Sequence, residues 1–204
     1  MKRVSTTRDK MNEYINQLNN LNLNDTNVKM QIMGIEGKAS NEYWNAVKYF
    51  IPKEIGFESR TKKPTDLVNS MLNYGYAILA NEITKTILRN GLDPYCGFLH
   101  YDMINRTSLT FDLIESFRQQ IVDKTMISLV NRKQIKVSDI DKRNNLIKLE
   151  ARKIIINKIL DKIHSTVTYN GKTLSYAQIM DLQTKNLVNT LLNDEKFNGF
   201  YITW

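Results

Sequence analysis

Long stretches of this sequence carry neither glycine nor proline, and this constrains the fold more than any other feature. The 204 residues include eight glycines and three prolines, and segment 109–170 contains neither type. Because these two residues are the strongest helix breakers, such stretches favour helices. The one strand-like alternation is at 166–169, where Asn170-Gly171 would form a hairpin turn. We therefore expect an all-α fold, a single multi-helix domain over 1–204.

Apolar residues at helical spacing predict the individual helices. These cover about 7–21, 25–33, 38–50, 66–90, 109–131, 138–163 and 175–193. Gly34 is expected to interrupt the second predicted helix, and segment 53–63 reads as a loop. The C-terminal helices occupy about 138–204, and the aromatic tail 197–204 is expected to pack against the body.

The charge balance points toward polyanions. Lys and Arg number 29 against 21 Asp and Glu, a net charge of +8. Such a surface attracts nucleic acid, although many basic proteins never bind it. No apolar run approaches the roughly 18–20 residues of a membrane helix, and no secretory signal is visible. The single cysteine, Cys96, is expected to be buried, and it suits a cytoplasmic location.

Three segments carry residues suited to chemistry. Glu36 lies between Gly34 and Gly37, and the alternative is an exposed glutamate at a helix break. His100 precedes Asp112 and Glu115, which are three residues apart and share a helix face. The alternative is that His100 caps or packs while the two carboxylates are solvated. The other histidine, His164, is expected to be a surface residue near a helix end.

Glu36, His100 and Glu115 together make a chemically sensible metal set. One imidazole and two carboxylates suit octahedral Mn²⁺ or Mg²⁺. Such an ion polarises a phosphate and activates an attacking hydroxyl. Other enzyme classes fit poorly, because the CxxC, HExxH, GxGxxG, GxxxxGK[ST] and GxSxG patterns are absent.

Four blocks of the sequence resemble the CRISPR-associated Cas-one family, in that family's order and spacing. They are 34–39 (GIEGKA, followed by Tyr43-Trp44), 66–76 (DLVNSMLNYGY), 91–100 (GLDPYCGFLH) and 108–123, which holds DLIESFR and Val122-Asp123. The blocks extend over about 34–123. Together they are far more specific than any single motif in the chain.

The resemblance implies an all-α catalytic domain with a metal bound by Glu36, His100 and Glu115. It implies that Asp112 supports this set, and we expect Arg118 to assist. The family's activity is metal-dependent DNA cleavage and transesterification, in which a DNA 3′-hydroxyl attacks a phosphodiester at a CRISPR repeat. A small Cas-two-type partner bridges two dimers of the integrase. A transposon integrase of the casposon type would use the same three residues.

Two departures from the family pattern are visible. Ser116 and Gln119 stand where the family usually has proline, which affects helix shape rather than the ligands. The sequence also begins at what resembles the first catalytic helix, so we expect these 204 residues to lack the family's N-terminal β domain. That domain helps to form the homodimer, so a DNA-binding or assembly module, inactive alone, is the competing hypothesis.

Basic residues near the blocks are the candidates for DNA contact. Arg60, Lys62 and Lys63 lie in the loop before the 66–90 helix, and Arg118 can reach either a phosphate or Glu115. The basic stretch 142–162 has a solvated helix face as its alternative. Four tyrosines could stack on bases, with core packing the alternative for the first two: Tyr74, Tyr76, Tyr95 and Tyr101.

Overall fold

The computed structural model describes residues 2–100, 105–141 and 143–201. Its helices and strands follow in chain order: α1 (Lys2–Asn19), α2 (Val28–Val47), η1 (Lys48–Phe50), η2 (Lys53–Ile55), α3 (Leu67–Arg89), α4 (Ser108–Arg118), η3 (Gln119–Asp123), α5 (Lys124–Asn131), η4 (Val137–Asp139), β1 (Ile140–Asp141), β2 (Leu146–Ile147), α6 (Leu149–His164), β3 (Thr166–Tyr169), β4 (Lys172–Ser175) and α7 (Tyr176–Asn193). Strands occur in the described part only as two antiparallel pairs, β1–β2 and β3–β4. The all-α prediction is confirmed.

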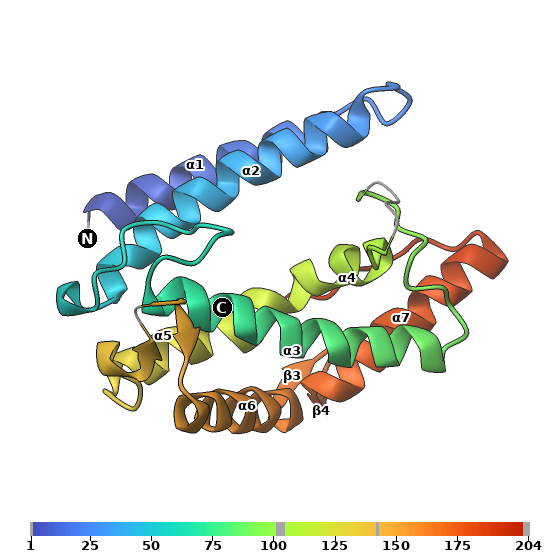
Figure 1. Cartoon of the computed structure of the whole chain (residues 1–204). Helices are drawn as coiled ribbons and strands as arrows, with labels where there is room; N and C mark the ends of the chain where they lie inside the picture. The colour runs from blue at the N-terminus through green and yellow to red at the C-terminus, as the bar shows by residue number, and fades with distance from the viewer. Residues whose placement is uncertain (1, 101–104, 142, 202–204) are drawn as a thin grey trace.

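Helix α3 is the centre of the fold, and α4, α5, α6 and α7 pack around it (Figure 1). It begins at Asp66, whose side chain accepts a hydrogen bond from the Asn69 N–H at 2.9 Å, a typical N-cap. Gly75 lets the next layer approach closely, because a Cβ there would lie 2.7 Å from Val122 Cγ1. The predicted 66–90 helix is therefore confirmed, and its burial explains its long apolar pattern.

Helices α1 and α2 form an antiparallel hairpin that lies along one side of the molecule (Figure 1). The predicted break at Gly34 is wrong, because α2 runs without interruption from Val28 to Val47. A glycine inside a helix costs only about 0.5–1 kcal/mol. Packing of α2 along α1, with Trp44 and Val47 buried in the core, outweighs that cost.

The predicted helix over 138–163 is wrong in its first half. Residues 137–141 and 146–147 form η4 and the small β1–β2 pair, and α6 begins only at Leu149. Asn145 adopts a left-handed φ of 55° in the turn between the strands, which asparagine tolerates better than most residues. The side chain of Asn144 accepts the Leu146 N–H at 2.9 Å, so local polar bonds replace helix bonds here.

The remaining C-terminal elements agree with the sequence. Asn170 and Gly171, with φ of 50° and 73°, form the turn between β3 and β4. Ser175 caps α7. The tail packs as expected at Phe200, whose ring stacks on Phe117 with centroids 5.1 Å apart. Trp204 lies outside the described residues.

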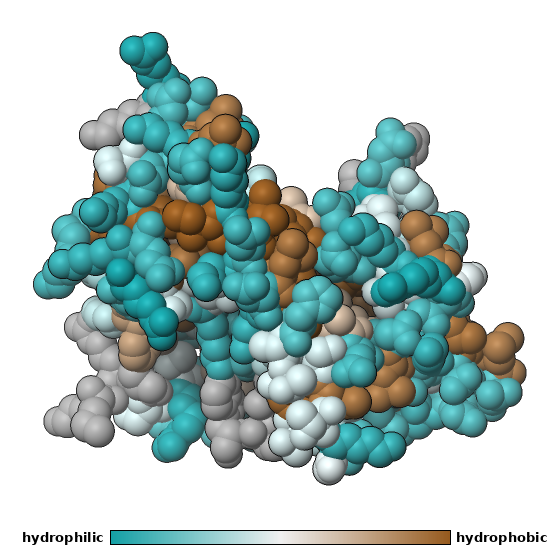
Figure 2. All heavy atoms as spheres, turned by 90° about the horizontal axis from the view of Figure 1, so that it is seen from below, coloured by the Kyte–Doolittle hydropathy of each residue, from teal (hydrophilic) through white to brown (hydrophobic). Residues whose placement is uncertain are grey.

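On the face shown in Figure 2, hydrophilic residues predominate, and hydrophobic ones are visible in the middle and toward one edge. In the described part of the chain, none of the helices combines the length and apolar character needed to cross a bilayer.

Cys96 is exposed, which corrects the expectation of a buried cysteine.

Candidate functional site

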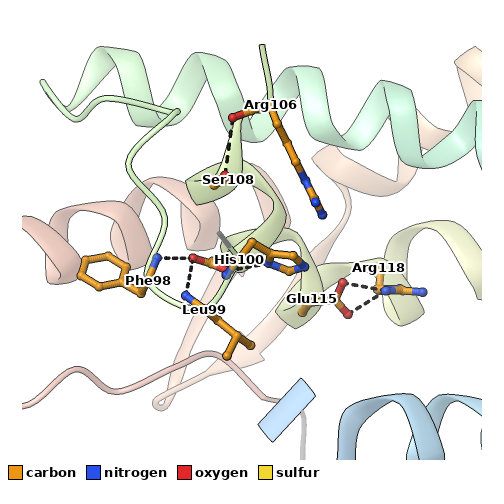
Figure 3. A network of polar contacts seen from close by, with 8 residues as sticks. Phe98, Leu99, His100, Arg106, Ser108, Glu115 and Arg118 are labelled. Carbon is orange, nitrogen blue, oxygen red and sulfur yellow. Dashed lines mark hydrogen bonds and ion pairs between the residues drawn. The ribbon is translucent and has the colours of Figure 1, made fainter. Parts of the chain in front are cut away.

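Asp112, in the first half of α4, organises the segment that carries His100. Its Oδ1 lies 2.6 Å from His100 Nδ1 and accepts the His100 backbone N–H at 3.1 Å. Its Oδ2 accepts the backbone N–H groups of Phe98 at 2.5 Å and Leu99 at 3.1 Å. Burial raises the pKa of Asp112, but these hydrogen bonds more than offset it, so the net pKa is lowered. The carboxylate therefore stays ionised and holds the imidazole (Figure 3).

Gly97 allows this segment to lie against the start of α4. A Cβ at Gly97 would stand 2.6 Å from Ser108 Cβ and 3.0 Å from the His100 carbonyl oxygen. Real Cβ atoms do not approach so closely, so a side chain here would push the two segments apart. Glycine at this position is therefore required for the placement of His100.

Glu115 lies one turn beyond Asp112 on α4 and is held by Arg118. Nη1 of Arg118 donates to both carboxylate oxygens of Glu115, at 2.6 and 2.8 Å. The Glu115 side chain is 35% exposed. Figure 3 shows the imidazole of His100 directed toward Glu115. The two predicted ligands from different segments therefore face a common space.

Glu36 faces the same space from α2. Its side chain makes no hydrogen bond or ion pair with the residues that the structure describes. Burial raises its pKa, and the negative charge of Glu115 raises it further, while Arg118 and His100 lower it. Glu36 also lines a small cavity together with Glu115 and Arg118, so these side chains lie near one another. As α2 has no break here, the idea of an exposed glutamate at a helix break is wrong.

One cavity of about 640 Å³ brings these residues together between the α1–α2 hairpin, α4 and α7. Its polar lining includes Glu36, His100, Asp112 and Glu115. Most of the remaining wall is apolar, with Ile15 of α1 among its residues. Charges in such surroundings are poorly solvated, which favours a counter-ion.

The donor types fit a divalent metal, although the side chains are not in ligating positions. In the part of the chain that the structure describes, no three His, Cys, Asp or Glu side chains are close enough together to hold one ion. In this arrangement both oxygens of Glu115 accept hydrogen bonds from Arg118. The second nitrogen of His100, Nε2, is left for a ligand because Asp112 takes Nδ1. A metal ion at Glu115 would share or displace this contact with Arg118.

A buried polar cluster that the sequence did not predict lies beside this site. Asp123, only 1% exposed, accepts hydrogen bonds from the Tyr76 hydroxyl at 2.5 Å and the Tyr43 hydroxyl at 3.1 Å. Burial raises its pKa to about 6, against the lowering effect of the Tyr76 bond and the Arg118 charge. Burial, followed by the charge of Asp123, raises the pKa of both tyrosines. Val122-Asp123 in the fourth block was the available signal.

The predicted DNA contacts separate into two kinds. Arg60 is half-buried and donates to the side chains of Asn69 at 3.0 Å and Asn73 at 2.6 Å. These bonds hold the loop that carries Arg60 against α3. Lys62 and Lys63 are exposed. The tyrosines divide likewise, because Tyr95 is exposed at 49% while Tyr74 and Tyr76 pack against the core. Tyr101 and Lys142 lie outside the described residues.

Comparisons with known proteins place the chain among its relatives. The family model described as CRISPR associated protein Cas1 matches residues 1–161. CRISPR-associated protein Cas1 3 of Methanobrevibacter ruminantium is 53% identical over 199 residues, which cover 95% of this chain and 60% of the relative. CRISPR-associated endonuclease Cas1 1 of Archaeoglobus fulgidus is 40% identical over 186 residues, covering 87% of this chain and 54% of the relative.

A solved structure extends the similarity to the fold. A casposase bound to its integration product has a TM-score of 0.77 and 31% identity, covering 84% of this chain and 52% of that chain. The chain thus spans between 54% and 60% of the length of the two curated relatives. The family match covers both helices of the α1–α2 hairpin and all of the residues that surround the cavity from α2 and α4. The chain belongs to the CRISPR-associated protein Cas1 family.

Proposed function

We propose that this chain is the catalytic part of a metal-dependent DNA endonuclease and integrase of CRISPR spacer acquisition. In the proposed reaction a DNA 3′-hydroxyl is joined to a phosphodiester of the repeat. One observation carries the proposal: Glu36, His100 and Glu115 line a single cavity, beside a carboxylate that fixes the histidine. Membership of the Cas1 family supports it.

The proposed cofactor is Mn²⁺ or Mg²⁺, held by Glu36, His100 and Glu115. When bound, such an ion polarises a phosphate and stabilises the charge that develops on the attacking and leaving oxygens. Asp112 accepts a hydrogen bond from the protonated Nδ1 of His100. The Nε2 lone pair of the same ring is then presented to the cavity. Glu36 and Glu115 supply the negative charge that draws a cation into largely apolar surroundings.

DNA is the proposed substrate. The net charge of +8 and the exposed Lys62 and Lys63 support contacts with the phosphate backbone. A Cas-two-type protein is the proposed partner, and the full-length protein is proposed to form a homodimer. Both proposals rest on family membership.

The test is a cleavage and strand-transfer assay on forked DNA with Mn²⁺. Glu36→Gln and His100→Ala should each lower the rate by about 100-fold or more, since even supporting groups of metal sites contribute 10–100-fold. The matched control is Glu150→Gln, a helical glutamate whose side chain is 80% exposed. It should keep full activity. Turnover that persists in Glu36→Gln, or in the presence of a chelator, contradicts the proposal.

Two other functions are separated by related measurements. A DNA-binding or assembly module would bind DNA in a salt-sensitive way and show no metal-dependent cleavage. A casposon-type integrase is favoured by the 31% identity to the casposase, but the 53% identity to a CRISPR-associated relative is higher. Strand transfer into a CRISPR repeat, compared with transfer into unrelated duplex DNA, distinguishes the two integrases.

A further inference from the structure

Arg118 stands between two acidic groups. On one side its Nη1 binds both oxygens of Glu115, at 2.6 and 2.8 Å. On the other side its guanidinium lies over the ring of Tyr76, 5.0 Å from the centroid. The hydroxyl of that same tyrosine donates to Asp123 at 2.5 Å. Arg118 is therefore in contact with Glu115 directly and with Asp123 through Tyr76.

Asp123 has no part in the metal set, yet it is the most deeply buried acidic group described near the site. It is 1% exposed, and isolated buried carboxylates are strongly unfavourable. Two hydroxyls, from Tyr43 on α2 and Tyr76 on α3, hold it. The charges of Arg118 and then Arg60 also stabilise its ionised form against burial. At neutral pH Asp123 is thus a negative charge, held in place within the influence of Arg118.

A small cavity gives the guanidinium room to move between its two acidic neighbours. It measures about 130 Å³ and is lined by Glu36, Glu115, Arg118 and Asp123 among others. A water molecule takes up about 30 Å³, so the space holds several waters or a displaced guanidinium. The flexible arginine side chain can shift within it without any movement of the helices.

We propose that Arg118 competes with a divalent cation for Glu115, and that Asp123 is a positioning residue that balances the charge of Arg118 when the cation takes its place. This inference rests on the proposed function. A guanidinium and a metal ion at the same two carboxylate oxygens compete for the lone pairs of those oxygens, and like charges so close repel strongly. With Asp123 nearby, the guanidinium stays on Tyr76 at a lower cost in free energy.

The two residues are then expected to act in opposite directions on cation affinity. In a Mn²⁺ titration followed by electron paramagnetic resonance without DNA, Arg118→Gln should bind Mn²⁺ about tenfold more tightly. Asp123→Asn should bind it about tenfold more weakly, within the usual range for groups outside the ligand set. Arg132→Gln, at the exposed C-cap of α5, and Asp161→Asn, at an exposed position of α6, serve as charge-matched controls and should bind as the wild type does.

Two further variants separate positioning from long-range charge and from misfolding. Tyr76→Phe keeps the ring under Arg118 but loses the bond to Asp123, and should weaken Mn²⁺ binding without any change in charge. In the double variant Arg118→Gln/Asp123→Asn, the effect of Asp123→Asn should largely disappear if it acts through Arg118. Melting temperatures identify any variant that is unfolded, and Tyr76→Phe then replaces Asp123→Asn.

The outcomes distinguish this inference from the proposed function. Weaker Mn²⁺ binding by Arg118→Gln, or additive effects in the double variant, would overturn the inference. So would a failure of both the wild type and Arg118→Gln to bind Mn²⁺. Binding only after Arg118→Gln would support it. The proposed function fails separately, if cleavage in Glu36→Gln is undiminished.

Discussion

Asp112 holds both the side chain and the backbone of His100, with Oδ1 2.6 Å from Nδ1 and 3.1 Å from the backbone N–H. This double contact sets the position of the residue and the tautomer of its ring together. The side chains are shielded, at 13% exposed for His100 and 11% for Asp112. A lowered pKa keeps the carboxylate charged against the effect of burial. The pair is thus preorganised to present Nε2 to the cavity.

Removing the charge of Asp112 should weaken metal use rather than unfold the chain. Asp112→Asn keeps the size of the side chain but lets the imidazole change tautomer. We expect Mn²⁺-dependent cleavage to fall by about 10–100-fold, with a higher Mn²⁺ concentration at half-maximal rate. Asp161→Asn is the matched control, because its side chain is 69% exposed on α6. An unchanged Mn²⁺ requirement in Asp112→Asn would show that the histidine is positioned by other contacts.

Two glycines should respond in opposite ways to alanine. At Gly97 the new Cβ would meet Ser108 Cβ at 2.6 Å, so Gly97→Ala should destabilise the fold by about 1–3 kcal/mol. At Gly34, inside α2, no atom lies within 4 Å of the new Cβ. Gly34→Ala should therefore stabilise the protein by about 0.5–1 kcal/mol. Urea unfolding of the two variants and the wild type measures both, and a stable Gly97→Ala variant would mean that Ser108 moves freely.

The glycines also show why the fold was only partly predictable. Gly34 and Gly37 suggested a break, and local propensity does favour one. The structure instead continues α2, because packing against α1 outweighs a small local cost. The helices α3 and α7 were predicted correctly from their apolar residues, because a buried helix face repeats apolar residues at helical spacing. The turn at Asn145 was missed because its cause is local hydrogen bonding, which periodicity does not reveal.

The candidate site was proposed from the sequence as a set of residues, without a geometry. Resemblance to family blocks selected Glu36, His100 and Glu115, and the three line one cavity. Spacing along the chain could not reveal that Arg118 occupies both oxygens of Glu115. Nor could it reveal Asp123, because its partners Tyr43 and Tyr76 come from two other helices. Contacts between helices depend on how the helices pack, which one sequence does not state.

Substitutions at Arg60, Lys62 and Lys63 should distinguish a structural role from a role in DNA contact. Arg60→Ala removes bonds to Asn69 and Asn73, so it should lower stability by about 1–3 kcal/mol, as expected for charge-assisted bonds. Lys62→Ala and Lys63→Ala are exposed and should leave stability unchanged. Each should instead weaken DNA binding and reduce its salt dependence by about one counterion. Unfolding curves beside binding titrations at several salt concentrations decide this, and equal stability of all three variants would make Arg60 a surface contact.

The buried carboxyl of Asp123 should leave a signature in the pH dependence of stability. Burial raises its pKa from 3.8 to about 6, although Tyr76, Arg118, Tyr43 and Arg60 all oppose that rise. Because the folded pKa lies above the unfolded one, the contribution to stability is full below about pH 4 and is lost as the pH rises through 6. The wild type, compared with Asp123→Asn, should therefore lose on the order of 2 kcal/mol between pH 4 and pH 7.5. Urea unfolding at both pH values measures the difference, with Asp161→Asn as the control that should run parallel to the wild type. A constant gap between wild type and Asp123→Asn would mean that Asp123 titrates alike in the folded and unfolded states, and that the tyrosines and arginines fully compensate its burial.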